Sequence, residues 1–158
     1  MPTCKRKLGI AALSLALCLA ACSGELPPAE EQIRKLNNDA ELAVEAKDVK
    51  TLKDFVADGY MDERGHDKSA LIRLVQLYLL RHRAVYVHTV TRSLVIIDED
   101  NAAAEILAAM AGQPVSNPDQ LFDMRADLVR FEVSYVRDGD EWQVRNVEWR
   151  RATVEDFL

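Results

Sequence analysis

Apolar positions between residues 29 and 81 recur with the period of an α-helix. Over residues 29–47 they fall at every third or fourth position, with charged and amide residues between them, which predicts an amphipathic helix. Asp48 is placed to cap a short second helix, and Asp67 is placed to cap a third one. The apolar stripe of this third helix is wide and covers residues 71–79. We therefore expect the third helix to be the central and most buried one.

From residue 85 onward the apolar period changes from helical to two, which predicts β-strands. Runs rich in Val, Ile, Thr and Ala cover residues 85–97 and 102–111, with the turn sequence "DEDN" between them. A loop with Gly and Pro precedes a second pair of strands, over residues 129–135 and 142–151, joined by an Asp-Gly hairpin turn. On the last strand the apolar residues occupy even positions before Arg145 and Asn146 and odd positions after them. Such a shift by one residue predicts a β-bulge.

These patterns predict an α+β domain with three N-terminal helices packed on a curved four-stranded antiparallel sheet. The stretch "VEAKDVKTLKDFVADGYMDERG" at residues 44–65 and the last hairpin, with Trp142 and Trp149, resemble the NTF2-like (SnoaL-like) superfamily. The resemblance implies a cone whose sheet wraps the first and third helices and whose open mouth can form a pocket. Members of the family include isomerases, dehydratases, cyclases and hydrolases as well as non-catalytic binders, so the fold does not select a function.

The amino-terminal segment has the layout of a secretory signal. Three basic residues at 5–7 precede an uncharged apolar run at residues 8–19, which is shorter than the roughly 20 residues of a membrane span. The junction "LAAC", from Leu19 to Cys22, resembles the lipobox of bacterial lipoproteins. By that resemblance residues 1–21 are removed and Cys22 becomes the acylated first residue. The alternative is a plain secretory signal followed by a chance cysteine.

Removal of the leader from the chain of 158 residues leaves 137, a normal size for one domain. We expect residues 22–28 to be the lipidated cysteine and its tether, residues 29–152 to be the NTF2-like domain, and residues 153–158 to be a C-terminal tail. The other two cysteines lie within the leader, so neither a disulfide framework nor a thiolate metal site is expected in the domain.

Charge and motif content narrow the function classes further. The leader takes three of the 20 basic residues and none of the 26 acidic ones, which leaves 17 against 26 and a formal charge of −9. Nucleic acid is therefore not an expected partner, because polyanion binding needs a basic surface. The three histidines lack metal-ligand spacing, and neither a Gly-rich phosphate loop nor a nucleophile elbow occurs. We expect no metal and no cofactor.

Five residues are candidates for a pocket inside the cone: Tyr60, His88, Arg125, Asp127 and Trp149. Trp149 can stack on a ligand, but a large aromatic in a final strand also suits the core, packed against the first or third helix. The isomerase branch of the family implies a tyrosine in the first helix opposite a carboxylate base, and this helix has no tyrosine. His88 and Asp127 are the candidates for a base and its orienting partner, with solvated strand residues as the alternative. No catalytic residue is assigned.

Two functions remain open at this point. We expect a membrane-anchored bacterial cell-envelope lipoprotein whose domain binds an envelope protein or a small apolar ligand without catalysis. The alternative is a small isomerase or dehydratase that uses a polar pocket inside the cone. Ser23 follows the cysteine, and by resemblance to enterobacterial sorting this favours the outer membrane, facing the periplasm. The family resemblance also leaves open a homodimer through the outer face of the sheet.

The lipobox yields a direct prediction. Cells that express the chain should incorporate radioactive palmitate into it, and the protein should fractionate with membranes because several acyl chains hold it there. Cys22→Ser should abolish both the labelling and the membrane fractionation. A Cys22→Ser variant that still incorporates palmitate would contradict the assignment.

Overall fold

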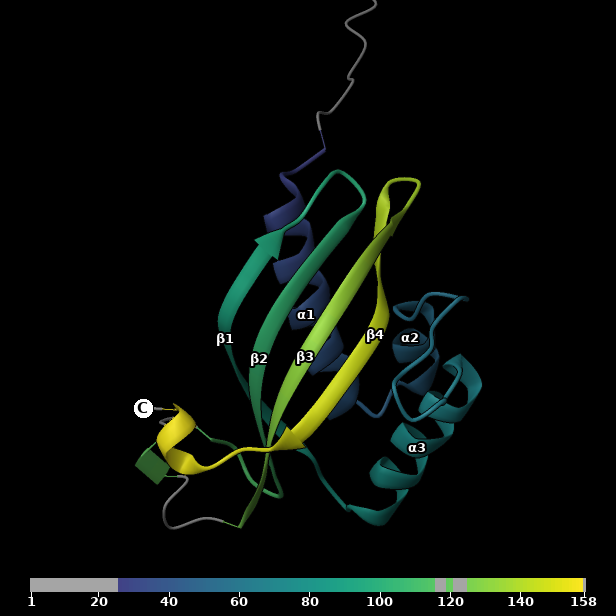
Figure 1. The fold of residues 1–158 in the computed structure, drawn as a ribbon. Coiled ribbons are helices and arrows are strands. Elements are labelled where there is room, and N and C mark those ends of the chain that lie inside the picture. The colour runs from purple at the N-terminus through teal and green to yellow at the C-terminus, as the bar shows by residue number, and fades with distance from the viewer. Residues whose placement is uncertain (1–25, 116–118, 121–124, 158) are drawn as a thin grey trace, which may run out of the picture.

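The computed structural model describes residues 26–115, 119–120 and 125–157. The proposed leader and Cys22 lie outside this part of the chain. Three helices precede four strands and a final 3-10 helix (Figure 1): α1 (Ala29–Glu45), α2 (Val49–Asp54), α3 (Lys68–Arg81), β1 (Tyr86–Ile96), β2 (Asn101–Ala111), β3 (Ala126–Asp138), β4 (Glu141–Arg151) and η2 (Val154–Phe157). The α+β class expected from the sequence is confirmed.

Side-chain caps fix the starts of α2 and α3. The Asp48 carboxylate accepts a hydrogen bond of 3.1 Å from the Thr51 backbone N–H, and Asp67 accepts one of 2.7 Å from that of Ala70. These bonds satisfy amide groups that the first turn of a helix leaves without a partner, and both caps predicted from the sequence are confirmed. No helix within the described residues combines the length and the apolar character that crossing a membrane requires.

The four strands form one antiparallel sheet in the order β1-β2-β3-β4. Gly139 adopts a φ of 61° in the turn between β3 and β4, a conformation that glycine reaches without steric cost. In β4, Asn146 pairs with Ser134 and Val144 pairs with Tyr135, so Arg145 is an extra residue. The predicted bulge is therefore present, and it lets the apolar residues on both sides of it face the same way.

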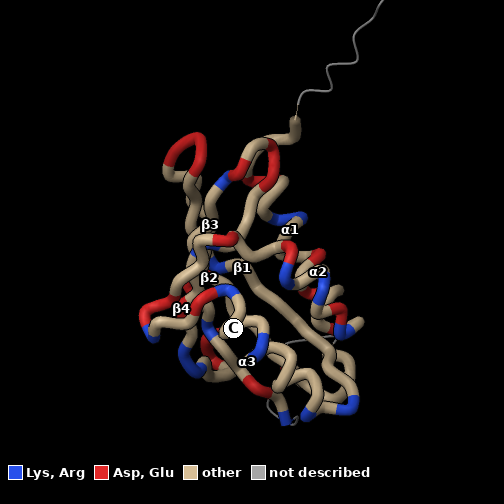
Figure 2. The backbone as a smooth tube through the Cα atoms, turned by 90° about the vertical axis from the view of Figure 1, so that its right-hand side faces the viewer, with Lys and Arg blue, Asp and Glu red and all other residues tan. Residues whose placement is uncertain are grey.

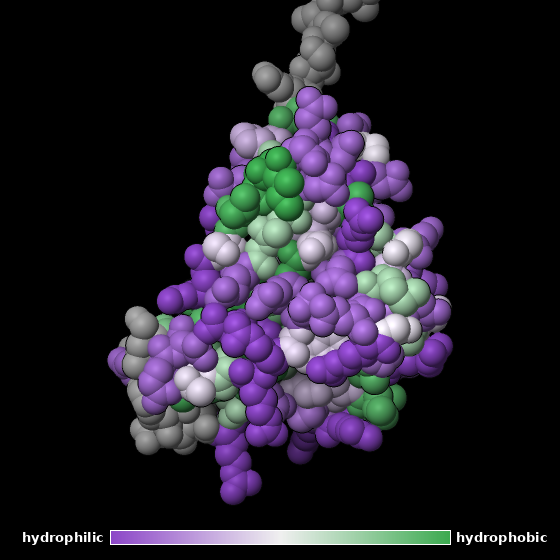
Figure 3. Space-filling view, viewed as in Figure 1, coloured by the Kyte–Doolittle hydropathy of each residue, from purple (hydrophilic) through white to green (hydrophobic). Residues whose placement is uncertain are grey.

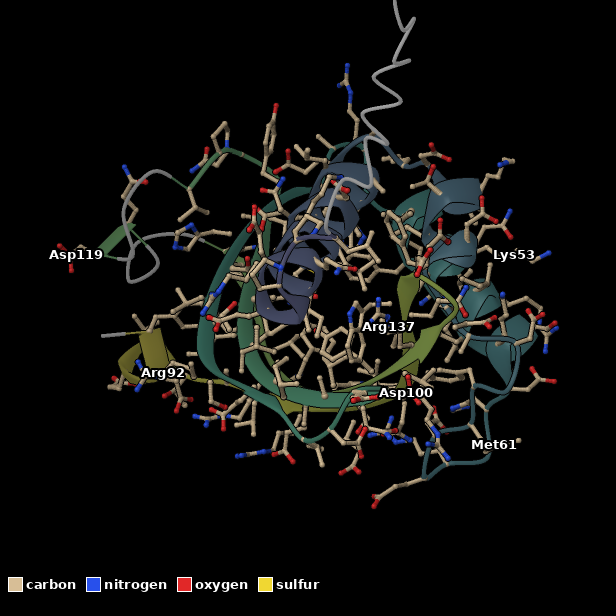
Figure 4. The ribbon with its side chains drawn as sticks, turned by 90° about the horizontal axis from the view of Figure 1, so that it is seen from above. Lys53, Met61, Arg92, Asp100, Asp119 and Arg137 are labelled. Atoms are coloured by element: carbon tan, nitrogen blue, oxygen red, sulfur yellow. The ribbon has the colours of Figure 1, made fainter. Side chains whose placement is uncertain are left out.

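The core lies in the narrow half of the cone, where α1 packs on the concave face of the sheet. Ile33 and Leu36 of α1 belong to one buried cluster with the small residues Ala102 and Ala104 of β2. Along its length α1 lies mainly against β1. Figure 4, seen from above, shows the sheet curving around α1 while α2 and α3 stand to one side.

The expectation that the third helix is the most buried one is wrong. Three residues of α1 are buried, whereas in α3 only Leu79 is, and Leu80 is 76% exposed. The physical reason is that α3 packs beside α2 and is not laid across the sheet. Much of its apolar stripe therefore has no protein surface opposite it.

On the convex face the last residues of the chain fold back onto the sheet. Phe157 of η2 is buried against Leu107 and Ala109 of β2, and the Arg130 guanidinium binds both Glu105 and Asp156. Residues 153–157, which were expected to belong to a C-terminal tail, therefore cover part of the outer sheet face. This is the face that the family resemblance suggested as a possible homodimer interface. Figure 3 shows that the other end of this face, near the end of β1, exposes apolar residues that include Val95 and Ile97.

The two tryptophans differ in burial, and this yields a stability prediction. Trp142 is 5% exposed and belongs to the main core cluster. Trp149 is half-buried and lies beneath the loop after α2. It therefore does not occupy the core position, packed against the first or third helix, that the sequence suggested. Trp142→Ala should lower the free energy of unfolding by about 3–5 kcal/mol, as large aromatic truncations in cores do. Trp149→Ala should cost clearly less in urea unfolding. An equal or larger cost for Trp149→Ala would contradict this placement.

Candidate functional site

A cavity of about 710 Å³ lies between α3 and the wide half of the concave sheet face. Its wall is mainly apolar. The residues that line it include, from α3 and from strands β3 and β4, Leu71, Leu74, Val75, Val129, Phe131 and Val147. The cavity exists because α3 stands beside the sheet without covering it. Its volume and lining match those of sites that enclose small molecules.

A hydrogen bond between α3 and β3 supplies the polar end of this cavity. The Tyr78 hydroxyl donates to Asp127 Oδ2 at 2.9 Å. Burial, followed by this hydrogen bond and the negative charge of Asp127, raises the pKa of Tyr78 well above its usual range. Tyr78 is therefore a neutral donor at physiological pH, and its proton is directed at Asp127.

Further polar groups adjoin this pair. His82 Nδ1 lies 2.8 Å from the Tyr78 carbonyl oxygen, and the two rings are 4.3 Å apart between centroids. His82 and Arg125 line a second hollow of about 420 Å³, which shares Tyr78 and Asp127 with the main cavity. The polar side chains thus gather at one end of an otherwise apolar site.

The expected pair of His88 and Asp127 does not form. In the register of the sheet, His88 shares a cross-strand row with Ala109 and Leu128, whereas Asp127 lies opposite Met110 in the neighbouring row. Side chains of neighbouring rows point to opposite faces of a sheet. His88 therefore lies on the convex side and Asp127 on the concave side, so the two cannot act together as base and orienting partner.

The other expected pocket residues have different positions. Trp149 lines the main cavity, and Arg125 lies just before β3 and lines only the adjoining hollow. Tyr60 lines neither, because it is 1% exposed and buried in the protein. Burial, together with the nearby Asp62 carboxylate, raises the pKa of Tyr60 to about 12. Tyr60 therefore has a structural position outside the candidate site.

A loop between α2 and α3 holds Trp149 in the cavity wall. Asp62 accepts hydrogen bonds from the backbone N–H groups of Arg64 and His66, at 2.9 and 2.8 Å, and its Oδ2 lies 2.8 Å from His66 Nδ1. Burial disfavours ionisation of Asp62, but these bonds outweigh it and keep its pKa below the usual range. The loop thereby places the Arg64 guanidinium 4.6 Å from the Trp149 ring centroid, within cation–π range.

Sequence reasoning missed Tyr78, His82 and Arg151 as site residues. Tyr78 falls within the apolar stripe predicted over residues 71–79, and Arg151, which lines the cavity, was not among the pocket candidates. One signal was available, because a buried tyrosine hydroxyl usually needs a hydrogen-bond partner. His82 follows Tyr78 by four residues, which brings the two together across one turn of helix.

The described part of the chain contains no group of His, Cys, Asp and Glu side chains arranged to hold a metal ion. Three carboxylates, Glu63, Glu132 and Glu148, lie near one another beside the loop between α2 and α3. There the negative charge of Glu63, then burial, then the charge of Glu132 raise the pKa of Glu148. Such mutual repulsion reflects like charges on an exposed surface.

Comparison with solved structures identifies the fold as NTF2-like. An NTF2-like protein of unknown function from Pseudomonas putida KT2440 superposes with a TM-score of 0.56 and 22% identity, over 79% of this chain and 88% of that one. Hexachlorocyclohexane dehydrochlorinase LinA-type3 from Novosphingobium barchaimii LL02 gives a TM-score of 0.60 and 14% identity, over 78% and 86% of the two chains.

A third similar structure is Bd1075 of Bdellovibrio bacteriovorus, with a TM-score of 0.62 and 14% identity. The likeness covers 78% of this chain but only 40% of that longer one. At such identities the shared property is the fold alone. No protein-family profile matches the chain, and no curated protein sequence matches it.

Proposed function

We propose that the domain binds a small apolar ligand in the cavity between α3 and the sheet and holds it without chemical change. The observation that carries this proposal is the cavity itself, about 710 Å³ in volume and lined mainly by aliphatic and aromatic side chains. Apolar walls exposed to water are unfavourable, and a ligand that removes them from water gains roughly 25 cal/mol for each Å² of apolar surface buried.

The polar end of the cavity favours a ligand with one hydrogen-bonding group. Tyr78 already donates to Asp127, and an ionised carboxylate has acceptor capacity for more than one donor. Arg151 lines the same cavity and offers guanidinium donors. A ligand with an apolar body and a single hydroxyl, amide or acid group suits this arrangement.

A second candidate is a proton-transfer enzyme with Asp127 as its base. The observation in its favour is a carboxylate at the end of a cavity, and the fold is shared with a dehydrochlorinase. Two features favour binding over catalysis. His88 lies on the opposite face of the sheet from Asp127, and the Tyr78 proton is directed at Asp127, so a reacting carbonyl would have to displace that bond to receive it.

We propose further that the domain is anchored to the bacterial envelope through acyl chains on Cys22, with residues 22–28 as its tether. The lipobox-like sequence supports this anchor. Ser23 follows the cysteine, and by resemblance to enterobacterial sorting this supports a location at the outer membrane, facing the periplasm. An anchored domain with an apolar cavity suits the handling of apolar molecules, which have low solubility in the space between membranes.

Binding can be measured with N-phenyl-1-naphthylamine, a neutral apolar dye whose fluorescence increases in apolar sites. The dye should bind in a saturable way and quench Trp149, because this side chain lines the cavity. Val129→Trp should fill the cavity and weaken binding about tenfold or more, which corresponds to about 1.4 kcal/mol.

The matched control is Val136→Trp on the same strand. Val136 is half-buried like Val129 but lies an odd number of residues away, so it points to the other face of the sheet. Equal dye binding by both variants would contradict the proposed site. Turnover of a screened ketone or hydroxy-lactone that is lost in a folded Asp127→Asn variant would establish the enzyme instead.

A further inference from the structure

The outward face of α3 has an unusual combination of side chains for this acidic protein. Leu74, Leu77 and Leu80 are 41%, 45% and 76% exposed. Arg73 and Arg81 are exposed beside them, since helical spacing places these five residues on one side of the helix. We call this set the α3 surface. The helix contains no Asp or Glu, although the chain contains 26 of them.

The positive charge of the α3 surface is not neutralised locally. In the described residues neither Arg73 nor Arg81 forms an ion pair or a side-chain hydrogen bond, whereas Lys50 and Lys68 pair with aspartates. Exposed acidic residues of α2 and of the loop before α3 include Asp54, Asp58 and Glu63, and many others lie at the far end of the molecule. Figure 2, seen from the side that carries α3, shows many of them on the two hairpin tips at the top, where the exposed residues are Asp98, Glu99, Asp100, Asp138, Asp140 and Glu141.

The α3 surface is continuous with the cavity. Leu74 is exposed and also lines the cavity, together with Leu71, Val75 and Tyr78 of the same helix. An apolar molecule that enters beside α3 therefore stays in contact with apolar side chains along its path. Helices with exposed leucines flanked by arginines are typical of segments that lie in a membrane interface, where arginines attract anionic headgroups.

We propose that the α3 surface docks on an anionic lipid membrane, so that the cavity exchanges its apolar ligand with that membrane. This inference rests on the proposed function, since it gives the cavity a source of ligand. The described chain begins at the end of the molecule that carries the hairpin tips, whereas α3 lies toward the opposite end (Figure 1). A domain anchored through Cys22 in one membrane therefore presents its α3 surface to another, and the acidic tips stay near the anchor.

The test is vesicle bridging by the full-length lipidated protein. The protein is reconstituted in phosphatidylcholine vesicles and mixed with vesicles that contain phosphatidylglycerol, and clustering is followed by energy transfer between two membrane dyes. Clustering should occur at low ionic strength and weaken at high salt, because exposed charges are screened. The double variant Arg73→Gln/Arg81→Gln should weaken clustering by about fivefold for each arginine removed. This factor corresponds to the roughly 1 kcal/mol that each basic residue contributes at an anionic surface.

The matched control removes two exposed arginines from the sheet, Arg92→Gln with Arg145→Gln, and should leave clustering unchanged. Arg92 lies on the opposite side of the molecule from α2 and α3 (Figure 4). Leu77→Asn with Leu80→Asn should also weaken clustering while the thermal midpoint stays the same, because both side chains are exposed. Equal clustering by the α3 arginine variant and its control would overturn the docking proposal, and it would favour a protein partner for this helix.

Separate measurements distinguish the failure of docking from the failure of the proposed function. Uptake of N-phenyl-1-naphthylamine reports the cavity, and it should be unchanged in the Arg73→Gln/Arg81→Gln variant. Flotation with the phosphatidylcholine vesicles reports the anchor. Should flotation fail, cosedimentation of the same chain with phosphatidylglycerol vesicles still tests docking directly, and absence of cosedimentation would overturn it. Dye uptake without any binding to anionic vesicles would overturn docking and leave the ligand-binding function intact.

Discussion

The separation between α3 and the wide half of the sheet is the constraint on which the candidate site depends. In the narrow half, α1 packs on the sheet and closes a core that includes alanines of β2. In the wide half α3 packs beside α2, and within the described residues the bond from Tyr78 to Asp127 is the one side-chain hydrogen bond that joins α3 to the sheet. Two apolar surfaces thus face a cavity instead of each other. A ligand that binds there stabilises the fold by an amount that grows with the logarithm of its concentration over its dissociation constant.

Local rules made much of the fold predictable. Asp48 and Asp67 could be identified as caps because a carboxylate before a helix satisfies free amides of the first turn. The bulge at Arg145 could be predicted because one inserted residue in a strand shifts the alternation of apolar and polar positions by one. The degree of burial of α3 could not be predicted from the sequence in the same way. An apolar stripe shows that one face of a helix avoids water, but it does not show whether a neighbouring element or an open cavity lies opposite that face.

The sheet face of a candidate site residue could be predicted only where the alternation along one strand determined it. Asp127 lies on the concave face together with Val129 and Phe131, with which it shares the parity of one strand, so its face can be derived from that strand alone. His88 lies on another strand, and its face depends on the pairing of β1 with β2, which contains an irregularity of its own. A shift of one residue in such a register moves a side chain to the other face. Tyr78 was missed because its partner is 49 residues away in the sequence.

The central claim is that α3 and the sheet enclose a cavity which an apolar molecule can occupy. The most direct measurement is a crystal structure of the protein bound to N-phenyl-1-naphthylamine. The account predicts electron density for the dye between α3 and β3, in contact with Phe131 and Trp149, while the bond from Tyr78 to Asp127 is retained. Density for the dye on the outer surface alone, or α3 packed directly onto Val129 and Phe131 with the cavity closed, would contradict it.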